Sequence, residues 1–221
     1  MARIKQPDKL RLIDMMTYFE QYEGLPEGLV QMPVPSRIKI KGRYYKVPGS
    51  LDDFLDTLVY GQRIFFTKEE TDDFSAIIRI MDCYYYPIVE KRKWNADNAL
   101  LFGKNILTCI VEQVYPVAMH MIKLVSEMAE REHKLLQREP TKLELAAGIE
   151  KLNVFAELSS LDFLRDAMKI TVGEVLQTPY KECLVRFMQQ KEVDDYKERY
   201  MKLMNEKATA EMKLKTKGKA K

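Results

Sequence analysis

Apolar residues recur every three to four positions along most of this chain, a spacing typical of amphipathic helices. The first such segment, for example, places Leu10, Ile13 and Met16 on one side. The pattern predicts a mainly α-helical protein. The expected helices span residues 8–23, 51–58, 68–86, 96–137, 142–157, 161–168, 172–177 and 179–212.

Local signals set the ends of several of these helices. Thr-x-x-Glu sequences begin at Thr67, Thr141 and Thr171, and each matches a capping box that satisfies amide donors at a helix start. Pro87 is expected to end the third helix, because proline cannot donate the helical hydrogen bond. For the same reason, the long helix over residues 96–137 is expected to kink near Pro116.

One stretch alternates with the period of a strand instead. In "RIKIKGRYYKVPGS", residues 37–50, Ile38 and Ile40 alternate with lysines, Gly42 interrupts the pattern, and Tyr45 and Val47 resume it. This pattern predicts a small basic β-hairpin. A lone hairpin is only marginally stable in water, so it should lie against something, either in this chain or in a neighbouring one.

These elements together predict a helical bundle with a long C-terminal helix and a small β-hairpin near the N-terminus. We divide the chain into an N-terminal helix and linker (1–36), a hairpin and short helix (37–66), a helical domain (67–200) and a basic C-terminal helix end or tail (201–221). The last helix is polar after Gln189, which predicts that it projects or is covered by a partner.

Composition narrows the function classes. The 221 residues include 36 basic and 33 acidic ones, for a net charge of +3, so a globally basic nucleic-acid binder is not indicated. The well-separated Cys83, Cys109 and Cys183 are predicted to be buried thiols in a reducing compartment. Neither a secretory signal nor an apolar run of about 18 residues is evident, so we expect a soluble protein made in a cytoplasm, without membrane contact.

Candidate catalytic chemistry is sparse. Glu130 and His133 have the Glu-x-x-His spacing that di-iron bundles use, but the second such motif is missing, because Val117 stands three residues before His120. A solvated helix face is the simpler interpretation. No phosphate-binding glycine loop, nucleophile elbow or Cys-x-x-Cys pair is present in the sequence. We therefore expect no enzyme activity, cofactor, metal or small-molecule substrate.

Two features leave contact with nucleic acid open. The aromatic run "CYYYPIVEKRKW", residues 83–94, could stack on bases, although tyrosines packed in the protein explain it more simply. The C-terminus "KLKTKGKAK" is either a solvated tail or a contact for packaged DNA or an acidic partner. Its lysines are Lys213, Lys215, Lys217, Lys219 and Lys221.

The segment "REPTKLELA", residues 138–146, resembles the part of bacterial sigma factors where Arg-Glu-Pro-Thr caps a helix of a DNA-binding helix pair. The later "SSLDFL" adds to this resemblance, which implies sigma-like DNA binding. A capped helix after a proline explains the same residues, and the segment is less basic than a groove-reading helix should be.

Two longer blocks resemble structural or tail-assembly proteins of crAss-like and related tailed bacteriophages. The first combines "I-x-G-x-x-Y-x-V" with "GQ-x-I-x-F", and the second combines "AGI-x-x-L-x-x-F" with a later "PY". The matching residues are Ile40, Gly42, Tyr45, Val47, Gly61, Gln62, Ile64, Phe66, Ala147, Gly148, Ile149, Leu152, Phe155, Leu161, Pro179 and Tyr180.

This resemblance implies a virion component that acts after synthesis and assembly in the host cytoplasm. The first expectation is a homo-oligomeric ring or connector subunit at the head–tail neck, in contact with other neck, portal or tail proteins. The alternative is a tail assembly chaperone. A ring subunit could use its hairpin against a neighbour, and the predicted contact residues are then Ile38, Ile40, Tyr44, Tyr45 and Val47.

Overall fold

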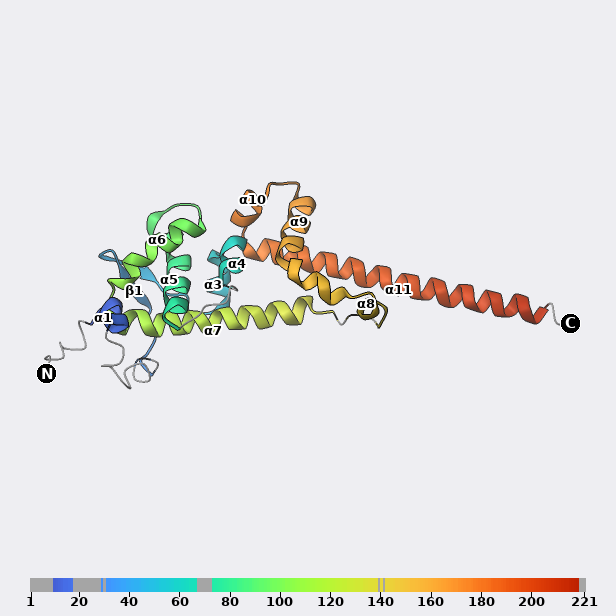
Figure 1. Ribbon diagram of the computed structural model, residues 1–221, viewed down its shortest axis with the longest axis horizontal. Coiled ribbons are helices and arrows are strands. Elements are labelled where there is room, and N and C mark those ends of the chain that lie inside the picture. Colours follow the sequence, from blue (N-terminus) through green and yellow to red (C-terminus); the bar gives the residue numbers. More distant parts are fainter. Residues whose placement is uncertain are drawn as a thin grey trace.

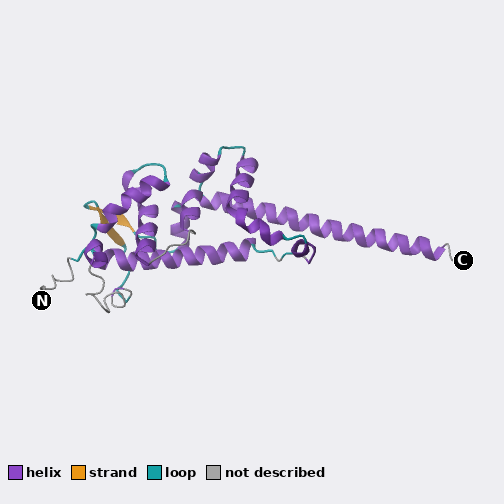
Figure 2. Ribbon diagram, viewed as in Figure 1, coloured by secondary structure: helices purple, strands orange, loops and turns teal. Residues whose placement is uncertain are grey.

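Helices form most of the part of the chain that the structure describes, and a β-hairpin lies near the N-terminus (Figures 1 and 2). The computed structural model describes residues 10–17, 29, 31–66, 73–138, 140 and 142–218. The predicted fold class is confirmed. The elements are α1 (Leu12–Thr17), β1 (Arg37–Ile40), β2 (Arg43–Lys46), α3 (Leu51–Thr57), α4 (Tyr60–Phe66), α5 (Asp73–Glu90), α6 (Ala96–Leu107), α7 (Val111–Leu136), α8 (Lys142–Ala146), the 3-10 helix η3 (Ile149–Phe155), α9 (Ala156–Met168), α10 (Val172–Gln177) and α11 (Tyr180–Gly218).

The elements gather into a body from which one helix projects (Figure 1). The hairpin, α1, α5 and α6 pack at one end of α7, while α3, α4, α9 and α10 surround the start of α11. At 39 residues, α11 is about 58 Å long. Its C-terminal half extends beyond every other element (Figure 1).

The hairpin is supported by this same chain. Its strands pair antiparallel from Arg37 opposite Lys46 to Ile40 opposite Arg43, and the turn between them has positive φ at Lys41 and Gly42, as tight hairpin turns require. The side chains of Ile38 and Ile40 are fully buried, and β1 lies against α7. The predicted need for support is therefore met within the chain.

Helix α5 runs through the middle of the core. Tyr84, Tyr85 and Tyr86 are all buried, because neighbouring elements cover this helix on several sides. The Tyr84 ring stacks on Phe54 at a centroid distance of 5.3 Å, and Tyr85 donates a hydrogen bond to the carbonyl of Lys46 at 3.3 Å. The aromatic run is thus part of the core, and its tyrosine rings are not available for stacking on bases.

The predicted helix end before Pro87 is wrong, since α5 continues to Glu90. A proline leaves the carbonyl four residues earlier without its helical donor, and here that carbonyl belongs to Cys83. The side-chain amide of Gln62, itself 1% exposed, donates to the Cys83 carbonyl at 2.8 Å. A tertiary hydrogen bond therefore replaces the one that proline removes.

The long helix predicted over residues 96–137 is two helices, and the break comes at residues 108–110 rather than near Pro116. The N-terminal segment pairs with the backbone exposed there. Leu12 donates to the Cys109 carbonyl at 3.0 Å, and Val111 donates to the Leu10 carbonyl at 2.8 Å.

The remaining boundaries follow local signals. The helix predicted over 142–157 breaks at Gly148, whose φ is +82°, and α9 starts at Ala156, earlier than expected. The capping box of Thr171 and Glu174 is confirmed. Helix α4 was not predicted, and the predicted caps at Thr67 and Thr141, like residues 18–23 of the first helix, lie outside the described residues.

Candidate interaction surfaces

A partly buried ion pair links α4 to α7. Arg63 of α4 forms a two-pronged ion pair with Glu132 of α7, with Nε–Oε1 and Nη2–Oε2 distances of 2.9 and 2.6 Å. Beside it, burial raises the pKa of the Tyr60 phenol to about 12. Both tyrosine and arginine therefore keep their protons at neutral pH, and the ion pair joins α4 to α7.

Asp82 of α5 is an unusual carboxyl group because it is 1% exposed. Burial raises its pKa to about 8, although a hydrogen bond from the Cys83 backbone and the charge of Arg79 oppose that rise. Asp82 lies close to Gly103 of α6, where an added Cβ would sit 3.1 Å from its Oδ2 atom. This tight packing leaves no room for a ligand on that side.

The remaining candidates for metal binding are Glu130 and His133, which have the Glu-x-x-His spacing. Glu130 and His133 are exposed on α7, in agreement with a solvated helix face. No group of three or more His, Cys, Asp or Glu side chains within the described ranges is placed to hold a metal ion. In that same part of the chain, no helix combines the length and apolar character needed to cross a bilayer.

The predicted hairpin contacts separate into two groups. Ile38, Ile40 and Val47 are buried in the protein's own core, and Tyr45 is half-buried. Tyr44, in contrast, is 65% exposed. The three aliphatic residues are therefore engaged within this chain, and Tyr44 is the hairpin residue that offers a large accessible surface to a neighbour.

The C-terminal lysines are described in part. Lys213, Lys215 and Lys217 lie on the last turns of α11, and Lys219 and Lys221 lie outside the described residues. The helix is thus continuous into the basic segment.

Several large apolar side chains are exposed in the chain from α8 to the first turn of α9. The chain from residue 142 to 158, which we call the α8–η3 segment, has short elements and no buried residue in α8. Leu143 and Val154 are 82% and 84% exposed. Because large contiguous apolar patches are typical of interaction sites, this segment is a candidate contact surface. Its members are Leu143, Leu145, Leu152, Val154, Phe155 and Leu158.

A second apolar surface follows α11 away from the body. At about 100° per residue, its members fall within an arc of roughly 100° on one side of the helix. We call them the outward stripe: Val193, Tyr196, Tyr200, Leu203 and Met204. The rings of Tyr196 and Tyr200 stack on each other with centroids 6.2 Å apart.

The outward stripe lies opposite the side of α11 that contacts the body. That inner side carries the buried Cys183 and Leu184, Phe187, which stacks on Phe163 of α9 at 5.5 Å, and Lys191, which donates to the Leu135 carbonyl of α7 at 3.0 Å. The helix is straight, so the side opposite these contacts stays the same along its length. The stripe lies on that side and therefore faces solvent. No other described part of the chain covers it.

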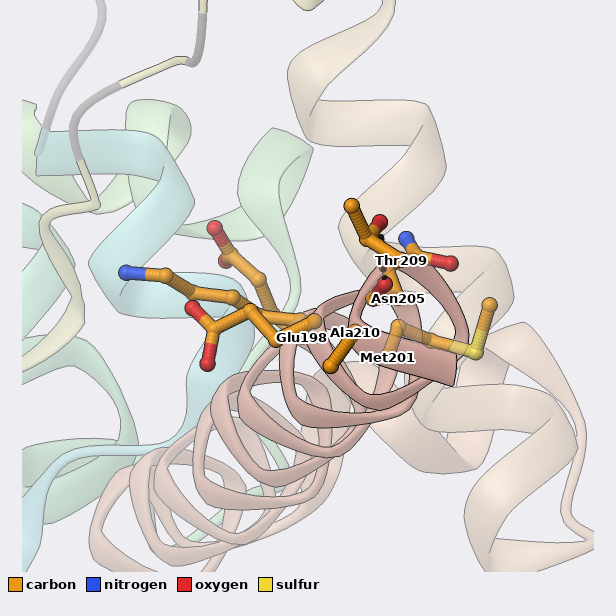
Figure 3. Close-up of a pocket in the computed structure, with 7 residues that line it drawn as sticks. Glu198, Met201, Asn205, Thr209 and Ala210 are labelled. Atoms are coloured by element: carbon orange, nitrogen blue, oxygen red, sulfur yellow. Dashed lines mark hydrogen bonds between the residues drawn. The ribbon is translucent and has the colours of Figure 1, made fainter. Parts of the chain in front are cut away.

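A shallow depression lies along α11 itself (Figure 3). All of its lining residues belong to this one helix, and Glu198, Met201 and Asn205 project from successive turns. A small-molecule pocket is normally enclosed by several elements. The surface in Figure 3 therefore suits an extended macromolecular partner better than a small ligand.

Part of this arrangement is visible in the sequence. Val193, Tyr196, Tyr200 and Leu203 have the 3-4-3 spacing of a heptad seam, but the charged residues around them made the helix appear uniformly polar. The exposed α8–η3 segment gives no such signal, because its apolar residues fit the same helical pattern as core residues.

Comparisons with known proteins identify no relative of this chain. A scan against protein families, a search of curated proteins and a search of solved structures all find no match to this chain.

Proposed function

We propose that this chain is a structural subunit of a tailed-phage particle, an oligomeric ring or connector protein at the neck between head and tail. Two lines of argument support the proposal. The hairpin block and the later helical block resemble such proteins, and the molecule exposes apolar surfaces suited to other chains. The exposed α8–η3 segment is the observation that carries the proposal, because a lone soluble chain gains nothing from leaving Leu143 and Val154 in water.

The geometry also suits head-to-tail contact. In a closed ring, each subunit uses one surface toward the preceding copy and a different one toward the next. The hairpin, which carries Tyr44, and the α8–η3 segment lie toward opposite ends of α7 (Figure 1). Two such separated surfaces could join successive copies, and the other neck, portal or tail proteins would stack on the ring faces.

The protein's place in the particle is tested by mass spectrometry of purified virions. A ring subunit should be present in a fixed small copy number relative to the major capsid protein. Its absence from infectious particles would refute the proposal.

The assembly surface is tested by substitution in the full-length protein. Val154→Asp should prevent formation of the closed oligomer, measured as mass in solution, while circular dichroism stays helical. Leu101→Glu is the matched control, because Leu101 is another exposed leucine, 62% exposed on α6, distant from the α8–η3 segment. If the two variants assemble equally well, the α8–η3 segment is not the contact.

A tail assembly chaperone is the second candidate, and the composition of α11 favours it. Met188, Met201, Met204 and Met212 are all exposed on this helix. Flexible methionine side chains adapt to varied apolar partners, as promiscuous binding surfaces require. A chaperone would bind an apolar helical client during assembly and would be missing from finished particles, so the same virion measurement distinguishes it from a ring subunit.

Two kinds of DNA contact are further candidates. The basic end of α11 is proposed to touch packaged DNA, and such binding should weaken steeply as salt is raised. Sigma-like recognition is less well supported, because α9 carries Glu157, Asp162 and Asp166 against one cation, Arg165. A helix with that charge is repelled by the phosphates that line a groove.

A further inference from the structure

The spacing of the outward stripe predicts the shape of its partner. Val193, Tyr196, Tyr200 and Leu203 are separated by three, four and three residues, which are the a and d positions of a heptad repeat. Their exposed fractions run from 46% to 64%. A narrow apolar seam on a straight helix is complemented by a second helix that lies along it.

The seam lies far enough from the body to be reached. From Tyr196 to Met212, every residue of α11 is exposed. An ion pair between Glu198 and Arg138, at 3.3 Å, joins α11 to the body on the inner side of the helix. A partner helix can therefore approach the stripe along several turns without displacing any described contact.

Charge argues against a parallel pair of two copies. With Val193 and Tyr200 at a, the flanking g and e positions would place Glu206 beside Glu211 of the second copy. Lys207, at the next a position, would meet its own counterpart. The lysine-rich ends of both helices would also lie together. Each of these contacts is repulsive.

An antiparallel pair removes these conflicts in one register. When Tyr200 lies opposite Leu203 of the second copy, the g positions place Arg199 beside Glu206 of the second copy. By symmetry, the contact occurs twice. Lys197 then flanks Met204 of the second copy, so no like charges meet there. Opposite charges at these positions set orientation and partner choice in coiled coils.

Registers shifted by one heptad are unfavourable. A shift in one direction places Arg199 beside Arg199 of the second copy and Glu192 beside Glu206. A shift in the other direction places Glu206 beside Glu206 of the second copy. Like charges at facing positions oppose both alternatives.

We propose that two copies of this chain pair through the outward stripe of α11 as an antiparallel two-helix coiled coil, centred between Met201 and Lys202. The contact is two-fold symmetric, with the same surface used on both copies. It leaves the hairpin and the α8–η3 segment free, and it does not depend on the proposed place of the protein in a phage particle.

The test is the mass of the purified full-length protein, measured by sedimentation over a range of concentrations at low salt. A concentration-dependent dimer is expected. Arg199→Glu and Glu206→Arg should each weaken dimerisation at least about tenfold, because each creates two like-charge contacts. The double variant R199E/E206R exchanges the charges and should restore the wild-type affinity. Lys202→Glu is the matched control, since position c faces away from the seam.

The outcomes separate the alternatives. In a parallel pair, Glu206→Arg would face Glu211 of the second copy and strengthen the dimer, while Arg199→Glu would face Met204 and change little. Either result, or a wild-type protein that stays monomeric at all concentrations, overturns the proposal. Because residues 199 and 206 are exposed on a projecting helix, the variants should fold, which circular dichroism will verify. The experiment uses isolated protein, so it can fail independently of the virion measurement.

Discussion

We expect Asp82 to make the stability of this protein dependent on pH. Its carboxyl group is 1% exposed between α5 and α6, and burial raises its pKa to about 8. An aspartate in an unfolded chain has a pKa of about 3.9. Between these two values, the folded state holds a proton that the unfolded state releases.

The sign of the effect follows from this difference. Because the folded state binds more protons, the free energy of unfolding decreases as pH rises from about 4 to about 8. Above that range, the titration of Asp82 causes no further change in it. A pKa of about 8 against one of about 3.9 corresponds to roughly 5 kcal/mol over the whole interval. That is a large share of the roughly 5–15 kcal/mol that stabilises a typical domain.

The perturbation is Asp82→Asn, which keeps the size of the side chain and removes its titration. Urea unfolding of both proteins at pH 5 and pH 8.5 gives the free energies. At pH 5, about one unit above the unfolded-state pKa, the variant should be more stable by only about 1.5 kcal/mol. At pH 8.5 the variant should be more stable by several kcal/mol, since wild-type Asp82 is then charged in an apolar site. The other titrating groups contribute equally to both proteins, so equal differences at the two pH values would refute this reasoning.

Two further substitutions test buried polar contacts by urea unfolding. Arg63→Met leaves Glu132 of α7 without its cation and should cost about 3–5 kcal/mol, whereas R63M/E132M, which removes both charges, should cost clearly less; equal losses would contradict the ion-pair argument. Gln62→Leu leaves the Cys83 carbonyl buried without a donor and should cost about 1–3 kcal/mol. In a Pro87→Ala background, the restored amide can donate to Cys83, so the same substitution should cost less; an unchanged cost would mean that Gln62 does not compensate for the proline.

The sequence predicts the kind of secondary structure well because that information is local. The period of the apolar residues marks the helices, and the alternation around Ile38 and Ile40 marks the hairpin. The capping box at Thr171 gives a helix start that the structure confirms. Each of these signals involves residues within a few positions of one another.

Helix ends were predicted less well where distant residues decide them. Helix α5 passes through Pro87 because Gln62, more than twenty residues earlier, supplies the missing hydrogen bond. The break between α6 and α7 depends on backbone pairing with Leu10 and Leu12. No pattern in the sequence near the break indicates that the N-terminal segment will lie there.

The candidate surfaces show the same division. The sequence predicts that the aliphatic residues of the hairpin contact a neighbouring chain, whereas the structure buries them against α7. The difference arises because alternation of apolar residues indicates a buried face but does not indicate which chain covers it. For the outward stripe, the sequence shows the pattern of contact residues but not their exposure. Its heptad spacing is present in the sequence, but its exposure depends on which side of α11 packs on the body, and that side is fixed by contacts with α7 and α9.

The distal part of α11 links folding to association. Beyond Glu198, the helix continues for about twenty residues, and each of them up to Met212 is exposed. Most helical stability in proteins comes from the packing of an apolar face rather than from the helix alone. The stripe supplies such a face, and Tyr200 and Leu203 lie at its centre. A second copy that packs against these residues would stabilise the helix and bury the stripe in one step, so ordering of the distal helix and pairing of two copies should be parts of a single equilibrium.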